Sequence, residues 1–416
     1  MRHSNVRRRI FKLSLFLAVP VLLATVSNVV HPASLADFSR LKGKQIIGAN
    51  DGGKYYSEFS SNEELKEATK EKNKELVADS VILLKNGGGA SGKENMLPYS
   101  GMKNISLFGV NSWAYAYGGT GSGSGQLEKG ADIYSSLENA GLKINPKLKQ
   151  LYMEHSKGSL SAEAKWSTPT YEDTELPMSL YTNTITSTYQ RYHDAAFIFL
   201  SRLGGEGADL GRKNVAGRDD PSMHYLELTT KEKDLIKHVE ANFDKVVVLV
   251  NSGNILEMGE LQNDPKISAI LSIGQTGDYG FDGVIRVLKG EVSPSGRTVD
   301  IWAKDFTTDP TYQNFGDGDQ TVERGTNTDY VSGGKSFGKE LEYEEGIYLG
   351  YKYYETMHNE IKAGKVDLTA ENTKKVLGSA DLGTDFQDAD DWYDKTIVYP
   401  FGYGLSYTNF EWSNFT

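Results

Sequence analysis

A glycine-rich segment at residues 204–209 carries the first two side chains that could do chemistry, Glu206 and Asp209. It reads GGEGAD and follows an apolar run at residues 195–200 that is typical of a buried strand. A carboxyl group placed where a parallel strand ends lies in the crevice in which open α/β sheets bind ligands, so Glu206 is a candidate general acid. Asp209 is a second candidate for the general acid, on weaker grounds. On the residues alone Glu206 could equally be a solvated loop side chain, the commoner state of a glutamate.

A pair of carboxyl groups would suit the hydrolysis of a glycosidic bond. In that reaction one carboxylic acid protonates the leaving oxygen, and a second carboxylate acts as nucleophile or base. Glu206 is a candidate for the first role, but no other carboxylate is equally marked for the second.

A run of glycines and hydroxyl residues at residues 118–125, GGTGSGSG, is the second candidate site. Glycines let the backbone approach a ligand, and free N–H groups at a helix start could hold an anion or a sugar hydroxyl. A dinucleotide site is the rival interpretation, but it needs an acidic residue at the end of the next strand, where residues 143–145 read KIN. A merely flexible loop is the third interpretation. The candidate binding residues are Gly118, Gly119, Thr120, Gly121 and Ser122.

Few other residues are of a catalytic type. The chain has no cysteine, which excludes disulfides, thiolate metal sites and cysteine nucleophiles. No G-x-S-x-G or H-E-x-x-H motif occurs, and we expect neither a metal nor a cofactor. His193 and His238 are expected to be surface or satisfied core residues. The acid and aromatic side chains at residues 390–392 (DDW) could serve a sugar site, but their polar surroundings favour a solvated loop.

The elements that must position these residues alternate between strands and helices. Apolar runs without period-two alternation predict strands covered on both faces, at residues 81–84, 105–110, 195–200, 246–250 and 267–273. Helices are predicted between them at residues 127–139, 147–155 and 231–242. Capping boxes, which satisfy free N–H groups at a helix start, are predicted at Ser61 with Glu64 and at Thr229 with Glu232. The pattern predicts an α/β fold, a mostly parallel sheet sandwiched by helices.

The two ends of the chain differ from this central part. Four arginines and a lysine precede an apolar run at residues 13–26, which is the layout of a signal peptide, and residues 34–36 (SLA) offer a cleavage site. An uncleaved membrane anchor is the alternative, because the run extended to Val30 approaches the minimum of about 17 residues for a transmembrane helix. After residue 305 the chain is rich in Asp, Gly, Thr and Tyr, and we expect a connector without a second core. A net charge of −11 argues against a nucleic-acid partner.

Several motifs together resemble those of family 3 glycoside hydrolases, in particular the members whose domains run in reversed order. The resemblance covers nearly everything from residue 61 to the end of the chain. Its motifs are residues 81–86 (VILLKN), 106–109 (SLFG), the loop at 118–125, 205–210 (GEGADL), 248–253 (VLVNSG), 290–297 (GEVSPSGR) and 400–407 (PFGYGLSY).

The resemblance implies retaining hydrolysis of β-glycosides, as in β-glucosidases, with a β-glucoside or oligosaccharide as substrate. It gives Glu206 the acid/base role and places residues 118–122 on the aglycone side of the pocket. In that family a separate (β/α)8 barrel supplies an aspartate nucleophile, and no barrel motif is found in this sequence. We therefore expect the acid/base half of an enzyme, inactive alone and completed by a barrel encoded downstream. A non-catalytic carbohydrate-binding or cell-surface protein is the alternative.

The expected organisation follows from these observations. The protein is expected to be secreted or anchored to the outer face of the membrane. The expected parts are a signal peptide or membrane anchor (1–36), a stalk (37–60), the α/β sandwich (61–305), an irregular connector (306–397) and the beginning of a fibronectin-like β domain (398–416).

Overall fold

The computed structural model divides the chain into two compact units, residues 1–72 and residues 73–416. It describes residues 57–87, 95–119, 131–156, 175–204, 210–212, 215, 218–314, 328–332, 335–340, 345–370, 385–409, 411 and 413. Within residues 1–72, the described part consists of residues 57–61 and the beginning of helix α2 (Asn62–Ser80), which continues into the second unit.

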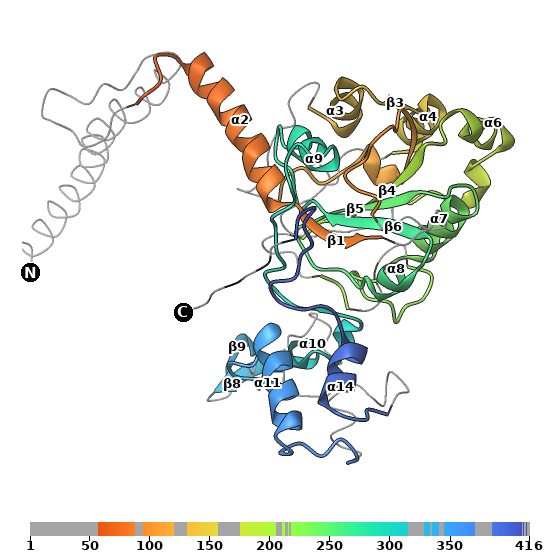
Figure 1. Ribbon diagram of the computed structural model, residues 1–416. Coiled ribbons are helices and arrows are strands. Elements are labelled where there is room, and N and C mark those ends of the chain that lie inside the picture. Colours follow the sequence, from red (N-terminus) through yellow and green to blue (C-terminus); the bar gives the residue numbers. More distant parts are fainter. Residues whose placement is uncertain are drawn as a thin grey trace, which may run out of the picture. The chain divides into compact units, whose positions relative to one another are not determined.

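A six-stranded sheet forms the centre of the second unit, in the order β1-β6-β5-β4-β2-β3. Neighbouring strands are parallel except β1, which pairs with β6 in the antiparallel sense at one edge (Figure 1). The predicted mostly parallel sheet is therefore confirmed. The strands are β1 (Ile82–Asn86), β2 (Asn104–Phe108), β3 (Lys143–Ile144), β4 (Ala195–Arg202), β5 (Val246–Ser252) and β6 (Ile267–Ser272).

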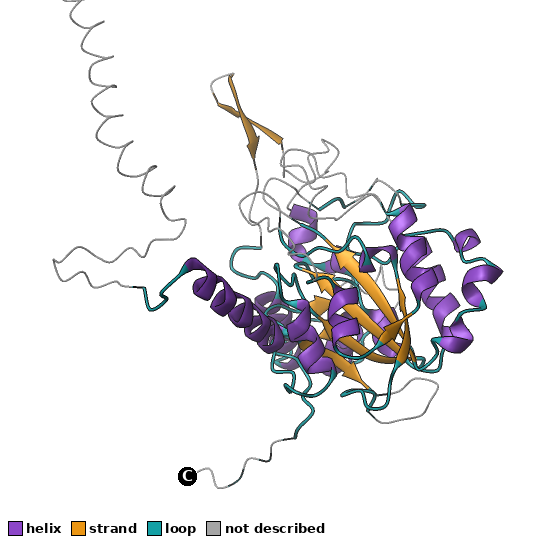
Figure 2. Ribbon diagram, turned by 90° about the horizontal axis from the view of Figure 1, so that it is seen from above, coloured by secondary structure: helices purple, strands orange, loops and turns teal. Residues whose placement is uncertain are grey.

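Helices cover both faces of this sheet (Figure 2). One hydrophobic cluster contains the end of α2 with α3 (Ile133–Asn139) and α9 (Phe281–Leu288), packed on the side chains of one sheet face. A second cluster contains α4 (Pro146–His155), α7 (Thr230–Glu240) and α8 (Gly259–Asn263) on the other face. Every residue of β4, β5 and β6 is buried, which explains why their sequences show no polar alternation. Among the described residues the chain also forms four short helical segments: η1 (Val110–Ser112), η3 (Met178–Leu180), α6 (Asn183–Thr186) and η4 (Tyr189–Arg191).

The helix starts agree with the capping predictions at one position and differ at another. At α7 both hydrogen bonds of the Thr229 and Glu232 capping box are present. At α2 the Ser61 hydroxyl accepts from the Glu64 N–H, but the Glu64 carboxylate accepts from Ser60 N–H, one residue before the predicted partner. Helix α3 begins later than predicted, because the side chain of Asp132 caps it.

A third hydrophobic cluster lies within residues 301–397, whereas a connector without a second core was expected after residue 305. The elements that the structure describes in residues 301–399 are β7 (Trp302–Ala303), η5 (Phe306–Thr308), α10 (Pro310–Asn314), β8 (Thr328–Ser332), β9 (Lys335–Glu340), α11 (Tyr351–Lys362), α14 (Ala389–Thr396) and β10 (Ile397–Tyr399). Tyr354 of α11 stacks on Trp392 of α14, and both side chains are buried. Residues 390–392, expected in a solvated loop, lie instead on this helix.

The chain then returns to the α/β sheet, where the start of a separate β domain was expected at residue 398. Strand β10 pairs with β7, and Leu405 forms a bridge with Leu83 of β1. The Tyr403 hydroxyl donates to the Leu84 carbonyl, and the Tyr407 hydroxyl donates to the Val287 carbonyl. Residues up to Tyr407 thus pack on the α/β unit, and the fibronectin-like domain remains a prediction.

Among the described residues, no helix combines the length and the hydropathy required to cross a bilayer.

Glu240 at the end of α7 gives this fold a testable dependence on pH. Burial, together with a hydrogen bond to Asp264 and the charge of that carboxylate, raises the pKa of Glu240 from 4.5 to about 7. At a pH between 4.5 and about 7, this carboxyl is ionised in the unfolded chain but protonated in the folded chain. The free energy of unfolding therefore falls as the pH rises through this range. Glu240→Gln should therefore gain about 2–4 °C in thermal midpoint over the wild type on going from pH 4 to pH 8. An equal difference between the two proteins at both pH values would contradict this assignment.

Candidate functional site

The loops that follow four parallel strands all begin at the same edge of the sheet. Because β2, β4, β5 and β6 run in the same direction, the loops that begin at Gly109, Leu203, Gly253 and Ile273 all leave from their carboxyl ends. This is the edge at which open α/β sheets bind ligands. The predicted site residues belong to the first two of these loops.

The structure describes only part of the predicted site. Gly118 and Gly119 are described and follow the η1 turn, while Thr120, Gly121 and Ser122 lie outside the described residues. Glu206 and Asp209 also lie outside them, and the last described residue before them is Gly204. The proximity of Glu206 to the glycine-rich loop therefore stays a prediction. The residues that flank both segments are described, and they show how the two loops are held.

Asn251, near the end of β5, bonds to the loops after β2 and β6 and to the end of β4. Its Oδ1 accepts hydrogen bonds from the Ala116 N–H and from the Ser201 hydroxyl, each at 2.8 Å. Its Nδ2 donates to the Ala116 carbonyl at 2.8 Å and to the Gly274 carbonyl at 2.6 Å. The Asn251 side chain is fully buried, so these bonds replace the hydration that the amide loses. One side chain thus fixes the loop after β2 against the ends of β4 and β6.

Other buried groups hold the start of the loop after β2. Gly109 has a φ of +97°, and a Cβ there would lie 2.5 Å from the Phe199 carbonyl oxygen, so only glycine fits. The Gly109 N–H donates to the Tyr152 hydroxyl at 3.0 Å, and the Val110 N–H donates to the Glu175 carboxylate at 3.1 Å. Burial raises the pKa of the Tyr152 phenol well above its usual range, which keeps it neutral. The backbone leading to Gly118 is therefore fixed at both ends.

Just after β4, Gly204 lies close to the side chain of Asn254. A Cβ at Gly204 would lie 2.9 Å from both the Oδ1 and the Nδ2 atoms of Asn254. A larger residue at position 204 would therefore displace this amide or redirect the chain just before Glu206. Neither Asn251 nor Asn254 was identified from the sequence. For Asn254 a signal was present, because it follows the buried strand β5 as Glu206 follows β4, whereas Asn251 lies within β5.

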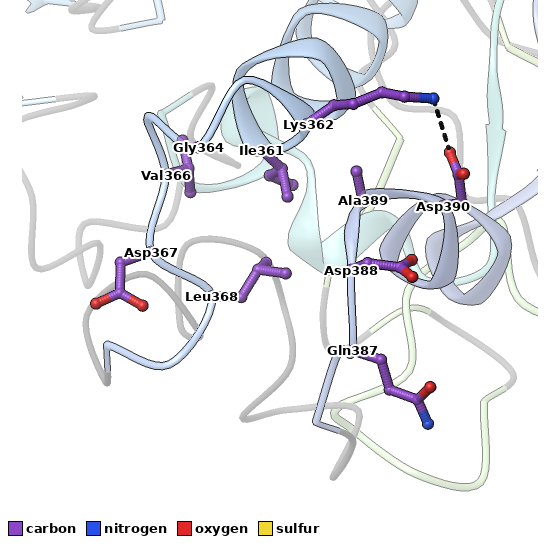
Figure 3. A pocket seen from close by; sticks show the side chains of 10 residues that line it. All are labelled: Ile361, Lys362, Gly364, Val366, Asp367, Leu368, Gln387, Asp388, Ala389 and Asp390. Atoms are coloured by element: carbon purple, nitrogen blue, oxygen red, sulfur yellow. Dashed lines mark ion pairs between the residues drawn. The ribbon is translucent and has the colours of Figure 1, made fainter.

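A pocket of about 600 Å³ lies elsewhere, between α11 and α14 (Figure 3). Asp390 at its rim pairs with His358 at 2.7 Å and with Lys362 at 3.7 Å. None of the predicted site residues lines it. No group of three or more potential metal ligands occurs in the described part of the chain. The lining residues are Ile361, Lys362, Gly364, Val366, Asp367, Leu368, Gln387, Asp388, Ala389 and Asp390.

Comparison with protein families identifies most of this chain. The family model described as "Glycosyl hydrolase family 3 C-terminal domain" matches residues 81–351. β-Glucosidase A of Butyrivibrio fibrisolvens is 27% identical over 356 residues, which cover 81% of this chain and 34% of that protein. A β-glucosidase of Ruminococcus albus is 28% identical over 343 residues, covering 82% of this chain and 28% of that protein. The chain thus spans about a third of the length of these relatives.

Solved structures show the same fold. β-Glucosidase 3B of Thermotoga neapolitana, in complex with glucose, is 26% identical with a TM-score of 0.58, covering 86% of this chain and 40% of that chain. The β-glucosidase of Paenibacillus barengoltzii is 24% identical with a TM-score of 0.56, covering 83% of this chain and 30% of that chain. In both cases the similarity is to a part of a larger protein.

Proposed function

The chain belongs to family 3 of the glycosyl hydrolases, and from this premise we propose that it supplies the general acid/base of a retaining β-glucosidase. Glu206 is the residue proposed for this role. The nucleophile is proposed to come from a (β/α)8 barrel that this 416-residue sequence does not contain.

One observation carries the proposal for Glu206. The family motif at residues 205–210, GEGADL, begins three residues after β4 ends at Arg202, in the loop that leaves the carboxyl edge of the sheet. A carboxyl group on this loop can reach a ligand that lies against the edge. The glycine-rich loop beginning at Gly118 leaves the same edge and is proposed to line the aglycone side. Asp209, on the same loop as Glu206, is proposed to contact the substrate.

The proposed chemistry assigns two successive proton transfers to Glu206. In the first step its carboxylic acid donates a proton to the glycosidic oxygen while the nucleophile attacks the anomeric carbon. In the second step the resulting carboxylate takes a proton from the water that releases the sugar. The chemistry also requires a nucleophilic carboxylate about 5 Å from the acid/base, on the other side of the scissile bond. No segment of this sequence matches the family's nucleophile motif.

The N-terminal segment supports a second proposal, about location. A basic stretch followed by the apolar run at residues 13–26 is typical of an export signal. We propose that the protein acts outside the cell membrane, either secreted or anchored to its outer face. N-terminal sequencing of the exported protein would test cleavage near residue 36.

We expect the purified 416-residue chain to hydrolyse 4-nitrophenyl β-glucoside no faster than buffer does. The same chain joined to a family 3 barrel should be active, because the second carboxylate is then present. The control is the barrel alone, which should lack the acid/base. Efficient turnover by the 416-residue chain by itself would contradict the proposal, and mutation of Asp209 and Asp391 would then locate the second carboxylate. Binding of β-glucosides without turnover by the joined protein would instead indicate a carbohydrate-binding protein.

A further inference from the structure

We propose that Arg202 is a positioning residue for Glu206, because its guanidinium closes the base of the loop on which Glu206 lies. This inference rests on the proposed function of Glu206. The loop leaves β4 after Arg202 and returns to the start of α7 at Thr229. Glu206 follows Arg202 by four residues in the sequence.

The Arg202 guanidinium bonds both to the returning chain and to α7. Its Nε donates to the Tyr225 carbonyl at 2.9 Å, and its Nη2 donates to the Glu227 carbonyl at 2.7 Å. Its Nη1 donates back to the Ser201 carbonyl at 2.9 Å. The two remaining bonds go to the two carboxylate oxygens of Glu232, each at 2.7 Å. These contacts match the five N–H donors that a guanidinium possesses.

Glu232 links this arrangement to the rigid start of α7. Its carboxylate also accepts from the Thr229 N–H at 2.9 Å as part of the capping box, so its orientation is fixed by the helix. Burial would raise the pKa of Glu232, but the charge and hydrogen bonds of Arg202 outweigh it and hold this pKa below its usual range. Glu232 is therefore ionised, and the pair is a charged, bidentate one.

Tyr225 adds a second connection across the same loop. Its hydroxyl accepts from the Leu203 N–H at 3.1 Å, directly after β4. Its own N–H donates to the Gly211 carbonyl at 2.8 Å. Residues 204–210, which include Glu206, therefore span two points that are both tied to Tyr225. The Arg202 guanidinium lies 5.6 Å from the Tyr225 ring and holds that side chain in turn.

This arrangement favours a positioning role over a general contribution to stability. Replacing a buried ion pair by apolar residues of similar volume is often neutral or stabilising, so stability alone does not require the pair. Its hydrogen bonds are directional, however, and they fix the path of the backbone at both ends of the loop. A displacement of about 1 Å at a reacting group can cost about 10²-fold in rate, so such a restraint has a large effect on catalysis.

The test compares two substrates in an active protein that joins this chain to a family 3 barrel. An alkyl β-glucoside needs a proton on its leaving oxygen, whereas a dinitrophenyl β-glucoside needs little such help. Arg202→Lys should lower kcat/KM for the alkyl glucoside by about 10²-fold and for the dinitrophenyl glucoside by only a few-fold. Tyr225→Phe, which keeps the packing, should show the same selectivity with a smaller loss. Arg191→Lys, at the end of η4 and before β4 begins, is the matched control and should change neither value.

Two outcomes would overturn the inference in distinguishable ways. Equal losses for both substrates, in proportion to the folded fraction seen by circular dichroism, would show that Arg202 and Tyr225 act on folding alone. Glu206→Gln on the same protein tests the premise, since it should show the largest selective loss. If Glu206→Gln is selective and Arg202→Lys and Tyr225→Phe are not, only the positioning role fails. If Glu206→Gln is not selective, the proposed function fails together with it.

Discussion

Replacing Glu206 by alanine should lower kcat/KM for an alkyl β-glucoside by about 10²–10⁴-fold in an active enzyme that contains this chain. The loss follows from the chemistry of the leaving group. An alkoxide is a poor leaving group, so its departure depends on a proton supplied in the transition state. A dinitrophenolate leaves without that proton, and its glycoside should lose far less activity in the first step. Steady-state kinetics with both substrates would measure the difference.

Azide separates the two roles proposed for Glu206. In the variant, a dinitrophenyl glucoside should still form the glycosyl-enzyme, but water then attacks slowly because no base removes its proton. Azide needs no base, so its addition should raise the rate and give a β-glucosyl azide as product. The retained β configuration follows from two successive displacements. Asp209→Ala is the control from the same loop and should not respond to azide. An azide response of Asp209→Ala, without one of Glu206→Ala, would reverse the assignment.

The central sheet could be predicted because its buried strands consist mainly of apolar residues. Strands β4, β5 and β6 are covered by helices on both faces, and this requires unbroken apolar runs that can be identified without any partner. The antiparallel sense of β1 was not predictable, since a short apolar strand carries no mark of its direction. That sense follows from its pairing with β6, far away in the sequence.

The core after residue 305 escaped prediction for a different reason. Its buried aromatic residues include Tyr354 on α11 and Trp392 on α14, two helices that lie far apart in the sequence. Their apolar character becomes evident only when α11 and α14 pack together. Helix α11 has twelve residues, but its buried positions are two tyrosines and one isoleucine among polar residues, so it contains no apolar run that marks a core helix.

Only part of the candidate site could be identified from local sequence. Glu206 was identified because a carboxylate after a buried strand is a local pattern. Asn251 was not, because its four partners are groups of Ala116, Ser201 and Gly274, which no local pattern connects. The residues that hold a site are defined by long-range contacts, whereas the residues that react are often marked by their chemistry.

Asn251→Leu should destabilise the α/β unit by at least about 4 kcal/mol, because four polar groups at the sheet edge lose their partner at about 1–3 kcal/mol each. Leucine has nearly the same shape, so the loss measures hydrogen bonding rather than a cavity. A thermal midpoint lower by roughly 8 °C or more is expected in calorimetry.

Thr276→Val is the matched control for Asn251→Leu at the same edge. The Thr276 hydroxyl is buried and forms no hydrogen bond within the described part of the chain, so valine, of the same shape, should leave the midpoint unchanged or raise it. A midpoint for Asn251→Leu close to that of Thr276→Val would show that the amide does not hold the edge together. If the loss is as large as expected, the loop before Gly118 and the end of β4 keep their mutual position through Asn251. The relative position of the two predicted site segments, residues 118–122 and the segment with Glu206, then depends on the buried Asn251 amide.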